Sequence, residues 1–246
     1  MLAVNALTLP SRREEAFRYS DVEALARVWP LAVEAIRVPA GTSDARAICN
    51  LADGDGVVAQ SLSITVEAGA DFTLHLLNAG GRLGRYALDV TLHEGASFTL
   101  NGAQIGAGAQ TLEIVSTITH AEPNAVSRQT VRSILSGGAT GTYLGKVAVA
   151  RGAQGTDSAQ SVRAMLLDRL STANAVPELE IFADDVKCAH GCAVGELDAM
   201  SLFYLASRGL DEAAAKRLLL QAFIAELFDG QDALLEAAMA RLEGVV

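Results

Sequence analysis

Three residues in the C-terminal third of the chain carry side chains that bind metals. In the stretch DDVKCAHGCAVGELD (residues 184–198), Cys188, His190 and Cys192 are separated by single small residues. In an extended segment alternate side chains point the same way, so this spacing predicts that the two thiols and the imidazole share one face. Thiolate and imidazole together are ligands for zinc, copper(I) and iron–sulfur clusters.

The same pattern also has a structural interpretation. Three residues along one strand lie on a line, so a metal would need a further ligand from elsewhere in the chain or from another chain. A free cysteine is also a common small, buried apolar residue, and this is the interpretation that we favour for Cys49. Glu196 and Asp198 are expected at the start of a helix, where the macrodipole stabilises carboxylates. The residues alone leave a structural role and a metal-binding role open.

Motifs for nucleotide chemistry or covalent catalysis are incomplete. TGTYLGKV (140–147) approaches a phosphate-binding loop, but it lacks the first Gly and the final Ser or Thr. GAGAQT (106–111) stops short of a dinucleotide fingerprint, and no GxSxG nucleophile motif occurs. His75 and His93 lie in alternating apolar runs, where hydrogen-bonded strand histidines are the simpler interpretation. The sequence predicts that the chain does not hydrolyse ATP by itself, while its many carboxylates leave a triad or a glycosidase pair open.

Composition narrows the classes of partner and the compartment. Half of the 246 residues are apolar and the formal net charge is −10 at pH 7, which argues against nucleic-acid binding through phosphate contacts. Three cysteines in a chain of this length indicate reduced thiols rather than a disulfide framework. Neither a secretory signal nor a run of 18 apolar residues is visible. We expect a cytoplasmic protein that binds neither nucleic acid nor membrane.

The elements that would position the Cys-His-Cys cluster change character along the chain. Residues 1–30 are typical of short helical pieces, and residues 31–195 contain short runs rich in Val, Ile, Leu and Thr, separated by turn residues. EAGADFTL (67–74) and HEGASFTL (93–100) repeat after 26 residues with no helix between them. A repeat of this length favours a parallel β-helix over a β-sandwich. We predict a mainly β fold whose β-helix follows a small helical N-terminal segment.

Residues 196–246 form a third region with helical periodicity. ELDAMSLFYLASRGL ends at Gly209, and EAAAKRLLLQAFIAELF and QDALLEAAMARLE follow. The helices carry a broad apolar stripe. The residues alone favour packing of the helices on each other or on the end of the solenoid over docking of a partner. The stripe comprises Leu218, Leu219, Phe223, Leu227 and Phe228.

Several blocks of the sequence resemble the SufB/SufD family of iron–sulfur cluster assembly proteins. Residues 178–223, with DDVKC-x-HG-x-x-VG-x-LD followed by LFYL-x-SRG, resemble the C-terminal region of that family and favour its SufD branch. HAEPNAVSRQTVRSIL and YLGKVAVARGAQGTDSAQSVRAMLL resemble its β-helix rungs, and PSRREEAFRYSDVEAL resembles its N-terminal element. Phe17, Ser20 and Cys192 depart from the family pattern, in which Trp, Thr and a small residue are usual. Cys188 and His190 follow it.

The resemblance implies a right-handed parallel β-helix with a helical C-terminal subdomain, and it implies two partners. A SufB-like subunit would pair with this β-helix through its end, or a second copy of the chain would do so when that subunit is absent. His190, with Cys188 as a second candidate, would ligate a transient iron–sulfur cluster at this interface, with none bound permanently. A SufC-like ABC ATPase would dock on the C-terminal helices, at Leu210, Leu218, Leu219, Phe223, Leu227 and Phe228.

The sequence thus predicts a non-catalytic scaffold subunit of a SufBCD-type complex, and two other classes of protein stay open. A β-helix enzyme acting on acidic polysaccharide is expected to show a secretory signal and a groove with basic or metal-binding groups, and neither is evident. A self-contained zinc protein would use the Cys-His-Cys strand. The SufB branch is a closer alternative, which the small number of cysteines disfavours.

Overall fold

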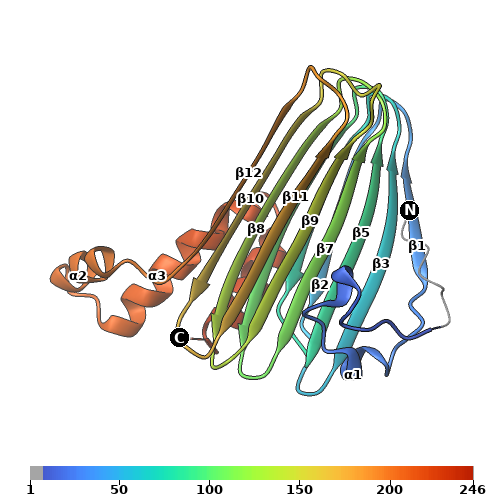
Figure 1. Cartoon of the computed structure of the whole chain (residues 1–246). Helices are drawn as coiled ribbons and strands as arrows, with labels where there is room; N and C mark the ends of the chain where they lie inside the picture. Colours follow the sequence, from blue (N-terminus) through green and yellow to red (C-terminus); the bar gives the residue numbers. More distant parts are fainter. Residues whose placement is uncertain (1–7, 246) are drawn as a thin grey trace.

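Two parallel β-sheets form the body of the molecule (Figure 1). The computed structural model describes residues 8–245. Successive strands alternate between the sheets, which have the orders β1-β3-β5-β7-β9-β11 (sheet A) and β12-β10-β8-β6-β4-β2 (sheet B). Each turn of the chain, here called a rung, therefore adds one strand to each sheet, and neighbouring strands pair in parallel. The predicted parallel β-helix is confirmed, in place of the β-sandwich.

The strands occupy residues 33 to 195. Sheet A consists of β1 (Val33–Val38), β3 (Val57–Val66), β5 (Leu83–Leu92), β7 (Thr111–His120), β9 (Thr140–Val149) and β11 (Thr172–Ile181). Sheet B consists of β2 (Ser43–Asn50), β4 (Asp71–Asn78), β6 (Ser97–Ala107), β8 (Val126–Ser136), β10 (Asp157–Leu166) and β12 (Lys187–Gly195).

The sequence repeat builds equivalent corners of successive rungs. Gly69 and Gly95 have φ of 64° and 62°, a left-handed conformation that favours glycine, and each turns the chain from sheet A into sheet B. The Gly69 amide donates a hydrogen bond to the carbonyl of Glu94 in the next rung, at 2.8 Å. Phe72 and Phe98 follow these turns as register partners, and their rings stack at 6.2 Å. The residues that repeat in the sequence therefore make the same contacts in successive rungs.

The N-terminal segment covers part of sheet A. It contains a short 3₁₀ turn, η1 (Glu15–Phe17), and one turn of helix, α1 (Val22–Leu25), whose N-cap is Asp21. Ser20 donates to Glu113 on β7, and Glu113 also pairs with Arg85 on β5; all three side chains are buried. Because a buried charge is costly without a partner, this contact fixes the segment to the sheet.

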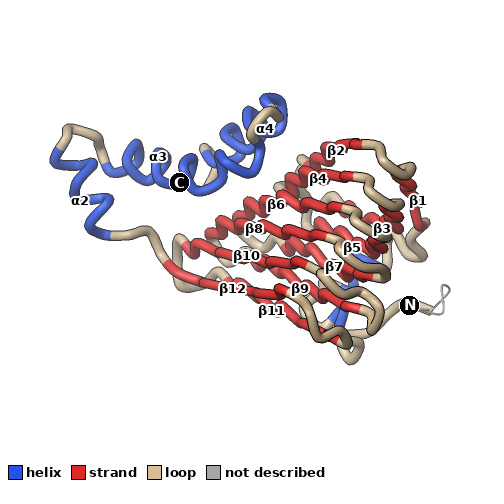
Figure 2. The backbone as a smooth tube through the Cα atoms, turned by 90° about the horizontal axis from the view of Figure 1, so that it is seen from above, coloured by secondary structure: helices blue, strands red, loops and turns tan. Residues whose placement is uncertain are grey.

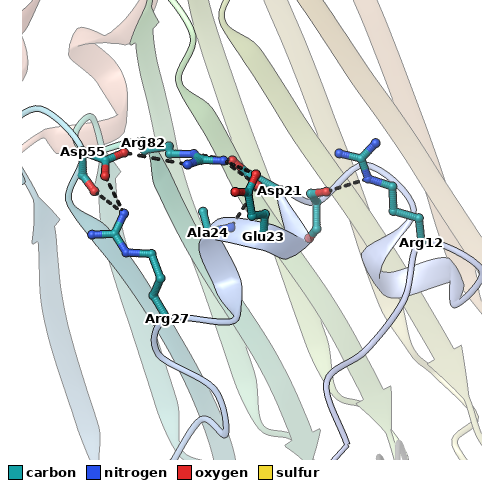
Figure 3. Close-up of polar contacts among 8 residues, drawn as sticks. Arg12, Asp21, Glu23, Ala24, Arg27, Asp55 and Arg82 are labelled. Atoms are coloured by element: carbon teal, nitrogen blue, oxygen red, sulfur yellow. Dashed lines mark hydrogen bonds and ion pairs between the residues drawn. The ribbon is translucent and has the colours of Figure 1, made fainter.

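Ion pairs at the surface continue this attachment (Figure 3). Arg82, which precedes β5, lies 2.7 Å from Asp21 and 3.1 Å from Glu23. Arg27 lies 2.7 Å from Asp55 in the loop between β2 and β3. Exposed pairs of this kind add little stability individually, so the buried hydrogen bond from Ser20 to Glu113 and the apolar contacts of Phe17 and Leu25 hold the segment.

The C-terminal helices cross the outer face of sheet B (Figure 2). They are α2 (Ala199–Ser207), α3 (Glu212–Ala225), the 3₁₀ turn η2 (Glu226–Phe228) and α4 (Asp232–Leu242). One apolar cluster joins α3, η2 and α4 to outward-facing residues of β4, β6 and β8 and to Ala79, which follows β4; the strand residues are Leu77, Ala103, Ile105 and Ile134. Helix α4 reaches the first rung, where Arg241 donates to the carbonyl of Leu51.

Helix α2 differs from α3 and α4 because it has no buried residue. Figures 1 and 2 both show it extending away from the sheets. Its N-cap is Asp198, whose carboxylate accepts hydrogen bonds from the amide and hydroxyl of Ser201 at 2.7 and 2.6 Å. None of the helices between residues 8 and 245 is both long and apolar enough to cross a membrane.

Candidate functional site

The last rung of the solenoid, formed by β11 and β12, places Cys188, His190 and Cys192 at an open end. β12 and β11 stand at the ends of sheets B and A, so each presents one edge that pairs with no strand of the described chain. An unpaired edge offers backbone N–H and C=O groups to another chain. We call β11 and β12 together the terminal rung.

The register of β12 shows which way its side chains point. Cys188, His190 and Cys192 lie beside Ser158, Gln160 and Val162 of β10. The side chains of these three β10 residues are buried in the solenoid, and register partners in a parallel pair share a face. The two thiols and the imidazole therefore face the interior side of the terminal rung, where no further rung covers them; Cys188 is half-buried, and His190 and Cys192 are exposed.

A row of hydroxyl groups lies beneath Cys188. Ser158 Oγ is 2.9 Å from Ser127 Oγ on β8, and Ser127 Oγ is 2.8 Å from Nε2 of the buried His120. Burial lowers the pKa of His120 to about 4, so its imidazole is neutral at pH 7. Burial also raises the pKa of the Cys188 thiol above its usual range, and the Asp157 carboxylate adds to this effect. Cys188 is therefore largely protonated until a metal binds it.

A second row, of amide side chains, lies beneath His190. Gln129 on β8 and Gln160 on β10 are register partners, and both are buried. Gln160 Nε2 donates to the carbonyl of Gly145 at 3.1 Å. Gln160 Oε1 and both polar atoms of the Gln129 amide have no hydrogen-bond partner in the described part of the chain. Polar groups in a solenoid interior usually find partners, so this row is unusual.

The two polar rows were missed by the sequence analysis, although the sequence carries a signal for them. SRQTV (127–131), SAQSV (158–162) and CAHGC (188–192) occupy equivalent positions of three successive rungs. The first and third letters are polar or metal-binding in each, and the fifth is Val, Val and Cys. Aligning the rungs on strand register, rather than on their turns, would have shown that the Cys-His-Cys strand ends two continuous interior rows.

Apolar side chains surround the opening of the terminal rung. Five large ones are exposed on β11, β12 and the adjoining loops: Leu170, Val176, Ile181, Phe182 and Val194. Single exposed apolar residues are ordinary, but a group at one end of a molecule marks an interaction surface. This group lies at the same end as the unpaired strand edges.

The terminal rung supplies an incomplete ligand set for a metal. Nowhere in residues 8–245 are three or more His, Cys, Asp or Glu side chains grouped closely enough to hold a metal ion. Of the carboxylates near the cluster, Asp198 is occupied as the N-cap of α2. Cys188, His190 and Cys192 therefore share one face of β12 without meeting this criterion for a metal-binding group.

The residues expected to dock a partner on the C-terminal helices have different positions. Leu227 and Phe228 are buried against the solenoid, so their side chains are not available on the surface of this structure. Leu218 is 45% exposed, and Leu210, Leu219 and Phe223 are half-buried. Met200, Phe203 and Tyr204 on α2 are exposed apolar residues that the apolar stripe of residues 218–228 did not include.

Comparison with known proteins finds similarity to iron–sulfur cluster assembly proteins. Residues 46–223 match a family model described as SUF system FeS cluster assembly, SufBD core domain. Chloroplastic protein ABCI7 of Arabidopsis thaliana is 35% identical over 165 residues, which are 66% of this chain and 35% of the relative. A SufBD family iron–sulfur cluster assembly protein of Synechocystis is 36% identical over 154 residues, or 62% and 34% of the two chains.

The iron–sulfur cluster assembly protein SufD of Escherichia coli is 36% identical over 118 residues, which are 47% of this chain and 28% of that protein. The chain therefore spans about a third of the length of the curated relatives that it matches.

Proposed function

The chain belongs to the SufBD family of iron–sulfur cluster assembly proteins, and from this premise we propose that it is a SufD-like scaffold subunit without catalytic activity of its own. In a complex with SufB-like and SufC-like subunits, its terminal rung would form half of the interface at which a cluster is assembled. The observation that carries the proposal is the open terminal rung, because it brings metal-binding side chains, unpaired strand edges and exposed apolar residues to one end.

His190 is the residue that we assign as the ligand on this side of the interface. It is exposed, and it lies on the interior face of β12, which no further rung of the described chain covers. Cys188 is the second candidate, but the raised pKa of its thiol means that binding must first release a proton. A cluster held here mainly by an imidazole, with thiolates from the SufB-like subunit, suits an assembly that must later release it. The cluster is therefore cargo rather than a permanent cofactor.

The C-terminal helices provide the second proposed interface, for a SufC-like ABC ATPase. Helix α2 exposes the apolar side chains of Met200, Phe203 and Tyr204, and none of its residues is fully buried. Leu218 and Leu219 lie on α3, which α2 contacts and which follows it in the chain. We assign Leu210, Leu218, Leu219 and Phe223 to this interface together with α2, while Leu227 and Phe228 support it from inside.

The test is anaerobic co-expression with the SufB and SufC proteins of the same source, followed by purification on this chain and assays of iron and sulfide. His190→Ala is expected to leave the complex intact and to lower its iron and sulfide content several-fold. His93→Ala is the matched control, because His93 pairs with Glu122 in a turn well before the terminal rung. The proposal would be contradicted if the chain purified without the other two proteins. It would also be contradicted if His190→Ala left the iron content of the complex unchanged.

A further inference from the structure

The amide row ends directly beneath His190. Gln160 and His190 are register partners on adjacent parallel strands, which lie about 4.8 Å apart. Both side chains are on the face that points into the solenoid, and Gln160 is only 3% exposed. Because no rung follows β12, the imidazole of His190 is the next side chain above the Gln160 amide in this row.

A hydrogen bond fixes the orientation of the Gln160 amide. Its Nε2 donates to the carbonyl of Gly145 on β9, across the interior. The opposite orientation would place two oxygen acceptors against each other, so the assignment of nitrogen and oxygen follows from the contact. Oε1 is therefore the free end, and it is buried without a donor among residues 8–245. A buried acceptor in this state costs free energy, which a neighbouring donor would recover.

Two neighbours in the row could supply that donor. Gln129 Nε2 lies one rung deeper, but it has no hydrogen-bond partner either, so it does not donate to Gln160 in this structure. His190 lies on the open side, and a neutral imidazole carries one N–H. Its exposed position lets the ring turn toward Gln160 without disturbing packed side chains.

We propose that Gln160 is a positioning residue for His190: its Oε1 accepts the N–H of one ring nitrogen and so directs the lone pair of the other nitrogen out of the open end. This role rests on the proposed function of His190 as a ligand to the cluster. Histidines that bind metals commonly donate their second N–H to an oxygen acceptor, which fixes tautomer and ring orientation. Gln160 itself would touch neither iron nor sulfide.

The test reads the His190 ring directly, in the full chain without a cluster. Long-range ¹H–¹⁵N NMR spectra of protein labelled with ¹⁵N-histidine distinguish the protonated from the unprotonated ring nitrogen, and His190→Gln identifies the His190 signals. In the unsubstituted chain at pH 8 we expect one tautomer of His190 to predominate. Gln160→Met, which has similar length and no amide oxygen, should move both ring nitrogens toward the averaged shifts of an exposed histidine.

Gln129→Met is the matched control, since it removes the same amide one rung deeper and leaves Gln160 in place. It is expected to leave the His190 signals unchanged. Identical His190 shifts in Gln160→Met and the unsubstituted chain would overturn the proposal. An equal change in both variants would also overturn it, because it would report a general loosening of the interior.

The same variants separate this proposal from the function on which it rests. In the co-purified complex, Gln160→Met should reduce iron and sulfide by less than His190→Ala does. Iron and sulfide that do not change in His190→Ala overturn the proposed function, whatever the spectra show. A loss in His190→Ala together with unchanged spectra in Gln160→Met overturns the role of Gln160 alone.

Discussion

Single residues in the interior of this solenoid are not uniformly apolar. The early rungs are filled by side chains such as Phe72, Phe98 and Leu100. Toward the terminal rung, His120, Ser127 and Gln129 replace them, and all three are buried. Buried polar groups lower the stability of the fold unless they are hydrogen-bonded. The replacement of apolar by polar residues therefore lowers stability in the rungs that lead to the candidate ligands.

His120 makes part of that cost measurable as a pH dependence. Its pKa is about 4 in the folded chain and about 6.5 when unfolded. The unfolded state therefore binds the proton first, and the free energy of unfolding falls as the pH drops from about 6.5 to about 4. A pKa difference of this size corresponds to about 3 kcal/mol.

The measurement is urea unfolding of the unsubstituted chain and of His120→Gln at several pH values between 4 and 7.5. The His120→Gln chain should start from a lower stability and lose less of it with acid. Parallel pH curves for the two chains would contradict the burial of a neutral His120.

Among the elements, the C-terminal helices have buried and exposed apolar residues close together in the sequence. Helices α3 and α4 and the turn η2 bury one face against sheet B. Nδ1 of His75 on β4 lies 2.9 Å from the carbonyl oxygen of Leu227. The opposite face of these helices and most of α2 remain exposed in the described chain. Whether an apolar residue here supports the fold or a partner therefore depends on its helical face.

Phe228→Ala and Leu218→Ala should separate these roles. Phe228 is fully buried, so its truncation is expected to lower the free energy of unfolding by about 3–5 kcal/mol. Leu218 is nearly half exposed, so its truncation should change stability little and weaken binding of the SufC-like ATPase. Urea unfolding and co-purification measure the two effects. A large loss of stability in Leu218→Ala, with binding of the ATPase unchanged, would contradict the assignment of Leu218 to the partner interface.

At the scale of the whole molecule, the two ends of the solenoid are unequal. Both expose a strand edge and some apolar side chains, and Val33 on β1 is 64% exposed at the first rung. Only the terminal rung combines an edge with Cys188, His190 and the exposed residues Phe182 and Val194. We therefore expect assembly to use the terminal rung.

A charge placed at each end tests this expectation. Val194→Glu should abolish pairing with the SufB-like subunit, because a carboxylate would lose its hydration in the interface. Val33→Glu, at the first rung, should leave pairing intact. Size-exclusion chromatography with light scattering reports the assembly, and far-UV circular dichroism shows that both variants fold. Equal loss of pairing in the two variants would contradict an interface at the terminal rung.

The sequence predicted more of the fold than of the candidate site. The β-helix was predictable from the turns at Gly69 and Gly95 and from the Phe-Thr-Leu repeat, because each rung repeats the same local contacts. The one-residue spacing of Cys188 and His190 predicts a shared face without saying whether that face is interior or outer. That depends on the register with β10. The burial of Phe228 and the exposure of Phe203 likewise depend on how the helices return to sheet B, which local periodicity does not determine.

That return path has a consequence for cooperativity. A stack of rungs in which each contacts only its neighbours behaves as a one-dimensional array, and its end rungs can melt independently. Here the chain leaves the last rung, crosses the stack as α3 and α4, and ties Arg241 to Leu51 beside the first rung. The helices thus connect the last rung to the first through contacts along sheet B. We therefore expect fraying of one end rung to disturb contacts at the other end, so that the stack unfolds as one unit.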